Sequence, residues 1–271
     1  MSGVRVPSLT PLKPQVSALT CDYVGLHGSV LSDPGSGIVR ARFFDDFLQR
    51  VTAGGNQAGS AGGRGLDRRA YRLSWPDDVR VFEPDQPEVL ARKQKFLDSA
   101  GAKPGCARLP IGVNLAGQWT APLLGAGFDP GTPSCWLAEG FLFYLPPDGI
   151  TRILDQVTRL AAAGSRLGFD IVNSATLTHP LTRPWIDMQA RAGAPWLGTL
   201  DDPAGFLAGR GWQVVGQGLG DVPLVPDART RIVLRAATGM ATDPRPQPVV
   251  AQLILVLPSA VQAARRVPPV R

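Results

Sequence analysis

A glycine-rich turn, followed by acids at the end of an apolar strand, constrains the fold of this chain more than any other feature. The turn reads GRGLDRRAYRL at residues 63–73, and the strand reads VRVFEPDQP at residues 79–87. Glycines let the backbone approach a ligand closely, and Glu83 and Asp85 follow Gly65 by 18 and 20 residues. A carboxylate at this spacing can accept hydrogen bonds from both hydroxyls of a ribose. The combination indicates a site for an adenosine-containing cofactor, although the turn alone would also suit an ordinary surface loop.

Apolar strands and amphipathic helices alternate from residue 62 to residue 215. We expect strands at 79–82, 107–115, 134–144, 166–172 and 211–215, and helices at 38–51, from Pro87, from Asp148 to Gly164 and at 203–208. This alternation predicts a doubly wound, Rossmann-like α/β sheet with helices on both faces and its site at the carboxyl ends of the strands. Residues 174–200 contain two tryptophans and several prolines, and we expect them to form a small cap over the site.

Three segments are expected to depart from this regular pattern. Residues 53–62, which should form the first strand, read AGGNQAGSAG and lack any β-branched residue, so this strand is expected to be poor. Residues 1–36 are rich in proline, serine and glycine and are expected to form an irregular arm. Residues 231–235 and 249–257 are expected to pair as antiparallel edge strands, and the last residues to form a frayed tail.

Three sequence blocks in series resemble the bacterial S-adenosylmethionine-dependent methyltransferases related to leucine carboxyl methyltransferase. They are the glycine turn, FEPDQP at residues 82–87 and WLAEGFLFYLP at residues 136–146; VRARFFDDFL at 39–48 and GFDP at 127–130 also match the family pattern. The resemblance covers roughly residues 37–216. It implies that residues 37–271 form a Rossmann-like methyltransferase domain that binds S-adenosyl-L-methionine.

The resemblance also implies which residues bind the cofactor: Arg40, Gly63, Gly65, Asp67, Glu83, Asp85, Asn114, Leu115 and Glu139. Arg40 matches an arginine that contacts the cofactor's carboxylate in the family, and its planar fork suits that role; the alternative is a solvated helix charge. Asn114 stands where the family usually has aspartate beside the adenine. No catalytic residue is assigned.

Glu139 is a single acid within an apolar run, and a buried carboxylate is costly unless something pairs with it. We expect Glu139 to face the ammonium or sulfonium end of the cofactor. An ion pair with Arg40 or Arg69 is the alternative. His27, His179 and Tyr144 are the other candidates for polar chemistry, and each is expected to be a loop or core residue rather than a base.

Composition narrows the classes of partner. Arginine dominates the 28 basic residues, and the formal net charge is +6. The sequence has no basic helical stripe interleaved with aromatic residues, so nucleic-acid binding is not predicted. Cys21, Cys106 and Cys135 lack metal-ligand spacing, so we expect no metal and a reducing, cytoplasmic location. The sequence contains no run of about 18 apolar residues, so we expect no membrane span. The expected partner is a small-molecule methyl acceptor; the oligomeric state stays open.

The function expected from these observations is methyl transfer from S-adenosyl-L-methionine to a carboxylate or hydroxyl of a small molecule. A degenerate paralogue that binds the cofactor weakly or not at all is the main alternative, and residues 53–62 motivate it. A nicotinamide oxidoreductase is less favoured because Arg68 occupies the position where its fingerprint requires a third small residue.

Overall fold

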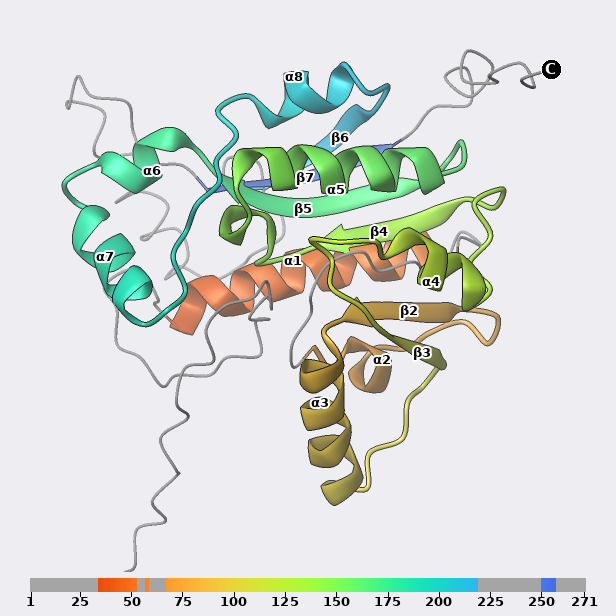
Figure 1. Cartoon of the computed structure of the whole chain (residues 1–271). Coiled ribbons are helices and arrows are strands. Elements are labelled where there is room, and N and C mark those ends of the chain that lie inside the picture. The colour runs from red at the N-terminus through yellow and green to blue at the C-terminus, as the bar shows by residue number, and fades with distance from the viewer. Residues whose placement is uncertain (1–33, 53–56, 59–66, 219–249, 257–271) are drawn as a thin grey trace, which may run out of the picture.

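The computed structural model describes residues 34–52, 57–58, 67–218 and 250–256 (Figure 1). The described strands are β1 (Gln57–Ala58), β2 (Arg80–Asp85), β3 (Ala107–Gly112), β4 (Ser134–Ala138), β5 (Arg166–Val172), β6 (Gln213–Gly218) and β7 (Val250–Val256). The described helices are α1 (Pro34–Thr52), α2 (Arg69–Arg72), α3 (Pro87–Ser99), α4 (Thr120–Gly125), η1 (Leu142–Tyr144), α5 (Pro147–Leu160), α6 (Ser174–Thr178), α7 (Arg183–Arg191) and α8 (Pro203–Ala208). The predicted alternation of strands and helices is confirmed.

The strands form a five-stranded sheet in the order β1-β4-β5-β7-β6 and a separate parallel pair, β2-β3. β4 runs parallel to both β1 and β5, whereas β7 is antiparallel to β5 and β6. The predicted edge strand at 249–257 is therefore present as β7, although it lies between β5 and β6. Its expected partner at 231–235 lies outside the described residues.

β1 is the weak point of the sheet. It contains two residues, which pair with Ser134 and Cys135 of β4, and among the described strands no backbone ladder joins it to β2. A segment rich in glycine gains little from strand formation, because it loses much backbone entropy and has few side chains to bury. Within the described residues the ladder reaches no further than β1; the rest of the segment in which a poor first strand was expected, residues 53–56 and 59–62, lies outside the described residues.

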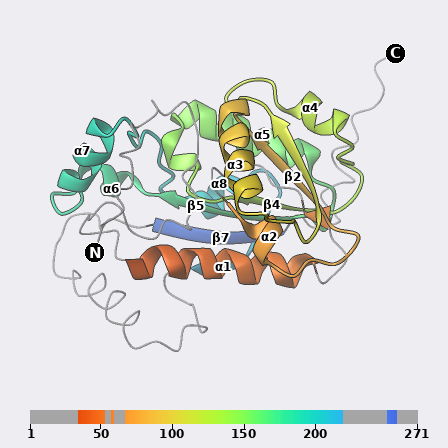
Figure 2. The same cartoon turned by 90° about the horizontal axis from the view of Figure 1, so that it is seen from below.

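Helices cover both faces of the sheet (Figure 2). On one face, Phe44, Phe47 and Leu48 of α1 pack against Cys135 and Leu137 of β4. On the other face, the apolar side of α5 packs against the alternate residues of β4, Trp136 and Ala138, and against β5; its buried residues include Ile150, Ile153, Leu154 and Val157. Adjacent residues of a strand point to opposite faces, so an uninterrupted apolar strand is what a two-sided core requires.

Aromatic rings connect the β2-β3 pair to the main sheet. Phe82 of β2 makes an edge contact with Phe128, at 5.5 Å between ring centroids, and Phe128 makes another with Trp136 of β4 at 5.1 Å. Trp119 contacts Trp136 at 6.4 Å and donates a 2.7 Å hydrogen bond to Gln156 of α5. Side-chain packing thus joins the two ladders of described strands.

Some predicted boundaries and residues were wrong. The apolar run at 134–144 was expected to be one strand, but β4 ends at Ala138, Gly140 turns the chain with φ +60°, and η1 follows. β3 ends at Gly112, before the predicted Leu115. The helical spacing of Val89, Leu90, Phe96 and Leu97 predicts one shared apolar face of α3, yet Phe96 is 56% exposed. Asp148 was expected to cap α5, but Pro146 occupies that position and the helix ends at Leu160 rather than Gly164.

Residues 174–200, predicted to form a cap insertion, contain α6 and α7, between β5 and α8. The backbone N–H groups of Leu197 and Gly198 bond to the carbonyl of Phe143 at 2.8 and 3.2 Å, and that of Leu200 bonds to Val172 at 3.0 Å. These bonds fasten the end of the insertion to the residues that follow β4 and β5. In the part of the chain that the structure describes, no helix has the length and apolarity to cross a membrane.

Candidate functional site

The ends of β4 and β5 bring two buried carboxylates to the same arginine. Because β4 and β5 are parallel, Glu139, directly after β4, lies near Asp170 in the last part of β5. Arg40 projects from α1 and places its Nε 3.3 Å from Glu139 Oε1 and its Nη1 3.1 Å from Asp170 Oδ2. The Glu139 and Asp170 side chains are almost completely buried, whereas the Arg40 side chain is 24% exposed.

Asp170 is the most strongly enclosed of these groups. Its Oδ1 accepts a 2.6 Å hydrogen bond from the backbone N–H of Gly140. Burial raises the pKa of the Asp170 carboxyl to about 6; the positive charge of Arg40 opposes this shift and the negative charge of Glu139 adds to it. Desolvation therefore outweighs the favourable ion pair, which is the usual balance for a carboxylate removed from water.

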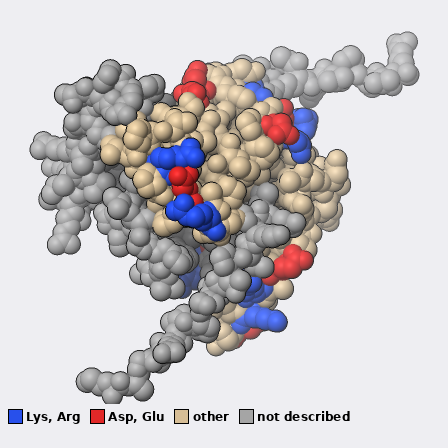
Figure 3. All heavy atoms as spheres, turned by 60° about the vertical axis from the view of Figure 1, so that its left-hand side comes forward, with Lys and Arg blue, Asp and Glu red and all other residues tan. Residues whose placement is uncertain are grey.

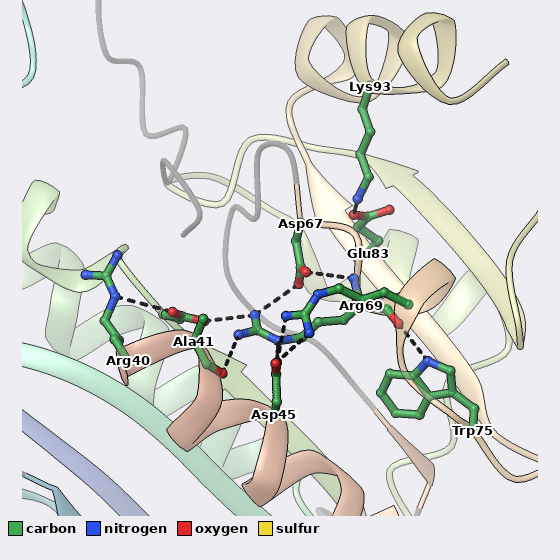
Figure 4. Close-up of polar contacts among 10 residues, drawn as sticks. Arg40, Ala41, Asp45, Asp67, Arg69, Trp75, Glu83 and Lys93 are labelled. Atoms are coloured by element: carbon green, nitrogen blue, oxygen red, sulfur yellow. Dashed lines mark hydrogen bonds and ion pairs between the residues drawn. The ribbon is translucent and has the colours of Figure 1, made fainter. Parts of the chain in front are cut away.

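Arg69 is a second buried arginine and joins the same cluster from α2 (Figure 4). Its guanidinium lies 2.8 Å from Glu139 Oε2, 2.5 Å from Asp45 Oδ1 and 3.4 Å from Asp67 Oδ2, and it donates a 3.3 Å bond to the carbonyl of Ala41. Arg72 binds the other oxygen of Asp45 at 2.5 Å. These contacts hold the start of α2, directly after the glycine turn, against α1.

The alternative interpretation of Glu139, an ion pair with Arg40 or Arg69, is confirmed, because Glu139 contacts both arginines. The alternative interpretation of Arg40, a solvated helix charge, is wrong. These contacts are compatible with a cofactor next to the same groups, so the predicted roles of Arg40, Asp67 and Glu139 in cofactor binding stay predictions. The structure brings these three residues together. Gly63 and Gly65 lie outside the described residues, as does His27.

Glu83 and Asp85 have different surroundings although both belong to β2. Glu83 is buried and paired with Lys93 of α3 and with Arg108 of β3, whose Nε lies 2.6 Å from Glu83 Oε2. Asp85 is the last residue of β2, is 1% exposed, and accepts a 2.7 Å bond from the backbone N–H of Gln86. A strand's carboxyl end is where a ribose-binding acid belongs. Asp85 fits that position, whereas Glu83 attaches α3 to the β2-β3 pair.

Asn114 and Leu115 follow β3 in the turn beside the end of β2. The backbone N–H of Val113 bonds to the carbonyl of Asp85 at 2.8 Å, which fixes this turn next to the strand end. Asn114 is exposed and its side-chain carbonyl accepts a 3.0 Å bond from the N–H of Ala116, whereas Leu115 is 3% exposed. The proximity of Asp85 and this turn is what the predicted adenosine site requires.

An aromatic cluster lies between this charged cluster and the insertion. Phe143 and Tyr144 of η1 contact Trp196 at centroid distances of 4.1 and 6.4 Å, and Trp185 of α7 contacts Trp196 at 4.3 Å. Burial raises the pKa of the Tyr144 hydroxyl, while the Trp196 indole and the Arg40 charge oppose that shift. Figure 3 brings forward the side of the molecule that carries α6 and α7; uncharged residues cover much of its described surface, and acidic and basic residues lie in several separate groups.

Two acids of this cluster were missed from sequence. Asp170 and Asp45 were not assigned to the site. Asp170 carried the same signal as Glu139, a single acid in an apolar strand, RLGFDIV. His179 lies directly after α6 and is buried, in agreement with the expectation of a loop or core residue, and its Nδ1 accepts a 3.3 Å bond from the N–H of Leu181. Among the described residues, no group of three or more histidines, cysteines or acids is arranged to hold a metal ion.

Solved structures show which class of fold this is. The chain is similar to a protein from Streptomyces avermitilis described as a DUF574 family protein, with a TM-score of 0.57 and 16% identity over 82% of this chain and 84% of that one. It is equally similar, at TM-score 0.57 and 15% identity, to a candidate methyltransferase from Thermobifida fusca, over 83% of this chain and 82% of that one. The fold is the Rossmann-like α/β fold of methyltransferases.

Sequence comparison identifies the family. Residues 34–158 match the model of the leucine carboxyl methyltransferase family. The chain is 41% identical to a candidate S-adenosyl-L-methionine-dependent methyltransferase of Saccharopolyspora erythraea over 68% of this chain and 66% of that protein. A similarly named protein of Mycobacterium marinum is 40% identical over 68% and 64% of the two chains. The chain belongs to the bacterial methyltransferases related to leucine carboxyl methyltransferase, and it spans a little under two thirds of the length of these relatives.

Proposed function

We propose that this chain is an S-adenosyl-L-methionine-dependent methyltransferase that methylates a carboxylate or hydroxyl of a small molecule. The observation that carries the proposal is the placement of polar side chains at strand ends. Asp85 ends β2, Glu139 follows β4, and Arg40 reaches the latter from α1. Relatives that share the surrounding sequence blocks bear the name of that activity.

The charge of the cluster suits a cationic cofactor. Among the described residues, the buried core of the site pairs Arg40 and Arg69 with three carboxylates: Asp67, Glu139 and Asp170. The neighbouring pair Asp45–Arg72 cancels, so one formal negative charge is in excess. S-adenosyl-L-methionine carries a sulfonium and an ammonium against one carboxylate, so its net charge is positive. A buried charge is stabilised by an opposite charge placed nearby, so the donor set fits this group.

Each end of the cofactor then has its own residues. Asp85 would accept hydrogen bonds from the ribose hydroxyls, and Asn114 and Leu115 would flank the adenine. Arg40 would bind the carboxylate through its planar fork, and Glu139 would face the ammonium or sulfonium. Asp67 would support Arg69 behind Glu139, since Arg69 contacts both acids. The bound cofactor supplies an electrophilic methyl group, so the chain mainly aligns the reactants and excludes water.

The acceptor would bind on the insertion's side of this cluster. Phe143, Tyr144, Trp185 and Trp196 offer an apolar surface with one hydroxyl, directly after the turn that carries Glu139. A carboxylate acceptor needs no base, whereas a hydroxyl acceptor requires one within hydrogen-bond reach. We take the carboxylate as the preferred acceptor, because it places no requirement for a base on the site.

Isothermal titration with S-adenosyl-L-methionine tests the proposal, with Asp85→Ala as the decisive variant. We expect wild type to bind and the variant to bind at least about tenfold more weakly, about 1.4 kcal/mol, because the ribose loses its acceptor. Asp78→Ala is the matched control, because Asp78 is an exposed acid just before the opposite end of the same strand. An unchanged affinity in Asp85→Ala would remove Asp85 from the ribose site.

The two-residue β1 favours one other function, a paralogue that has lost cofactor binding. The same titration separates the possibilities. No binding of S-adenosyl-L-methionine or of NAD by the folded chain would support the degenerate paralogue. Binding of NAD alone would support an oxidoreductase.

A further inference from the structure

Asp170 is a charged residue in the centre of the molecule whose presence the fold alone does not require. It lies in β5 between Phe169 and Ile171, and all three residues are 0% exposed. A buried ion pair is often no more stabilising than apolar residues of similar volume, because both charges lose their hydration. Apolar packing would therefore serve the sheet equally well, and the carboxylate calls for another reason.

The contacts of Asp170 reach two parts of the proposed cofactor site at once. Its Oδ2 lies 3.1 Å from Arg40 Nη1, and its Oδ1 accepts the 2.6 Å bond from the N–H of Gly140. Gly140 directly follows Glu139 and turns the chain with φ +60°. One oxygen of the Asp170 side chain thus contacts α1, and the other contacts the turn after β4.

These contacts close a ring of four residues. Asp170 holds Arg40, Arg40 lies 3.3 Å from Glu139, Glu139 is bonded along the chain to Gly140, and Gly140 returns to Asp170. Arg40 stands on a long side chain with many rotamers, so it binds a carboxylate well only when its fork is already oriented. Asp170 orients the Nη1 side of that fork and fixes the turn that aims Glu139.

We infer that Asp170 is a positioning residue that prepares Arg40 and Glu139 for the amino-acid end of S-adenosyl-L-methionine. This inference rests on the proposed function. It assigns to Asp170 no contact with the adenosine end, which Asp85 and the turn after β3 would bind. The loss of its charge should accordingly weaken one end of the ligand and not the other.

The experiment compares two ligands on Asp170→Asn and wild type by isothermal titration. S-adenosyl-L-methionine carries the amino-acid end, and 5′-methylthioadenosine lacks it. The variant keeps an oxygen for the Gly140 N–H but loses the charge that holds Arg40. We expect S-adenosyl-L-methionine to bind about tenfold or more weakly, and 5′-methylthioadenosine to keep its affinity within about twofold.

Asp155→Asn is the control, because Asp155 on α5 pairs with Arg210 at 2.7 Å, at a surface remote from this ring. Equal losses for both ligands would show that Asp170 acts only on the fold, and unchanged binding of both would reject the inference. If Asp170→Asn does not fold, Asp170→Ala replaces it with the same expected selectivity. Binding of neither ligand by folded wild type would instead refute the proposed function, and the inference with it.

Discussion

At the scale of single residues, Glu139 joins the two arginines of the site. One oxygen faces Arg40 and the other faces Arg69, at 3.3 and 2.8 Å. The ammonium group of a bound cofactor would therefore approach a carboxylate that Arg40 and Arg69 already neutralise. This arrangement pairs a buried carboxylate before any ligand is bound, and it weakens the attraction between that carboxylate and the ligand.

The charge of Asp170 should make the stability of the chain depend on pH. The pKa of this carboxyl is about 6 in the folded state, above its ordinary value of 3.8. The stability that the group contributes is therefore complete below pH 3.8 and is lost as the pH rises through 6. At 1.36 kcal/mol per unit the loss is about 3 kcal/mol. Asp170→Asn avoids this loss, so its free energy of unfolding relative to wild type should rise with pH.

Urea unfolding of both proteins at about pH 5 and about pH 8 should show about 1.4 kcal/mol of this loss, since the pKa of about 6 lies roughly one unit above the lower pH, and subtraction cancels the other titrating groups. Asp187→Asn is the control, because Asp187 forms a solvent-exposed pair with Arg183, and such pairs contribute little to stability. A difference between Asp170→Asn and wild type that stays constant or falls with pH would contradict the assignment.

The sequence predicted this part of the site incompletely, for a physical reason. Glu139 and Asp170 are both single acids in apolar runs, and burial makes either one noteworthy. Only Glu139 was assigned, because it lies in a block that resembles the family. The partners of an acid depend on which strand ends meet in space. The contact between Arg40 and Asp170 joins residues 130 positions apart, and no local pattern reveals it.

At the scale of elements, α3 is attached to the β2-β3 pair by a buried charge network. Glu83 of β2 binds both Lys93 of α3 and Arg108 of β3, and Arg108 also donates a 2.8 Å bond to Gln94 of α3. Lys93 is 1% exposed. In a buried network, removal of one member leaves the charge of its partner uncompensated. The free energy of unfolding then falls by more than the intact network contributed to it.

Lys93→Met should therefore destabilise the chain by about 3 kcal/mol, although methionine fills much of the same volume. Urea unfolding followed by circular dichroism provides the measurement. Lys95→Met is the control, because Lys95 is exposed on the same helix and should change stability by less than about 0.5 kcal/mol. Equal effects of the two substitutions would mean that the network does not hold α3 in place.

Elements were predicted best where the residue pattern admits one interpretation. β5 was expected at 166–172 and has those bounds, and α5 has the strong i, i+3, i+4 pattern of a helix covering a sheet. The run at 134–144 was misread because a continuous apolar stretch looks alike as strand, turn or 3₁₀ helix. Phe96 and Leu97 both fit the apolar pattern of α3, but Leu97 is buried whereas Phe96 points into solvent.

At the scale of the whole molecule, the described strands fall into two ladders. β1 forms a ladder with β4 and, among the described strands, none with β2. The proposed cofactor site uses both parts, since Asp85 belongs to one and Glu139 to the other. Its geometry therefore depends on side-chain packing between the two ladders, chiefly the rings of Phe82, Phe128 and Trp136.

Phe128→Ala should loosen the β2-β3 part before the rest. Phe128 is 4% exposed and is the ring between β2 and β4, so its loss leaves a cavity and costs about 3–5 kcal/mol. Hydrogen exchange of the folded variant should accelerate more in residues 80–85 and 107–112 than in β5 and β7, because regions with few connecting bonds open separately. Phe96→Ala, on the exposed side of α3, is the control and should leave exchange near wild type. Equal acceleration in all strands would show that the two ladders open as one unit.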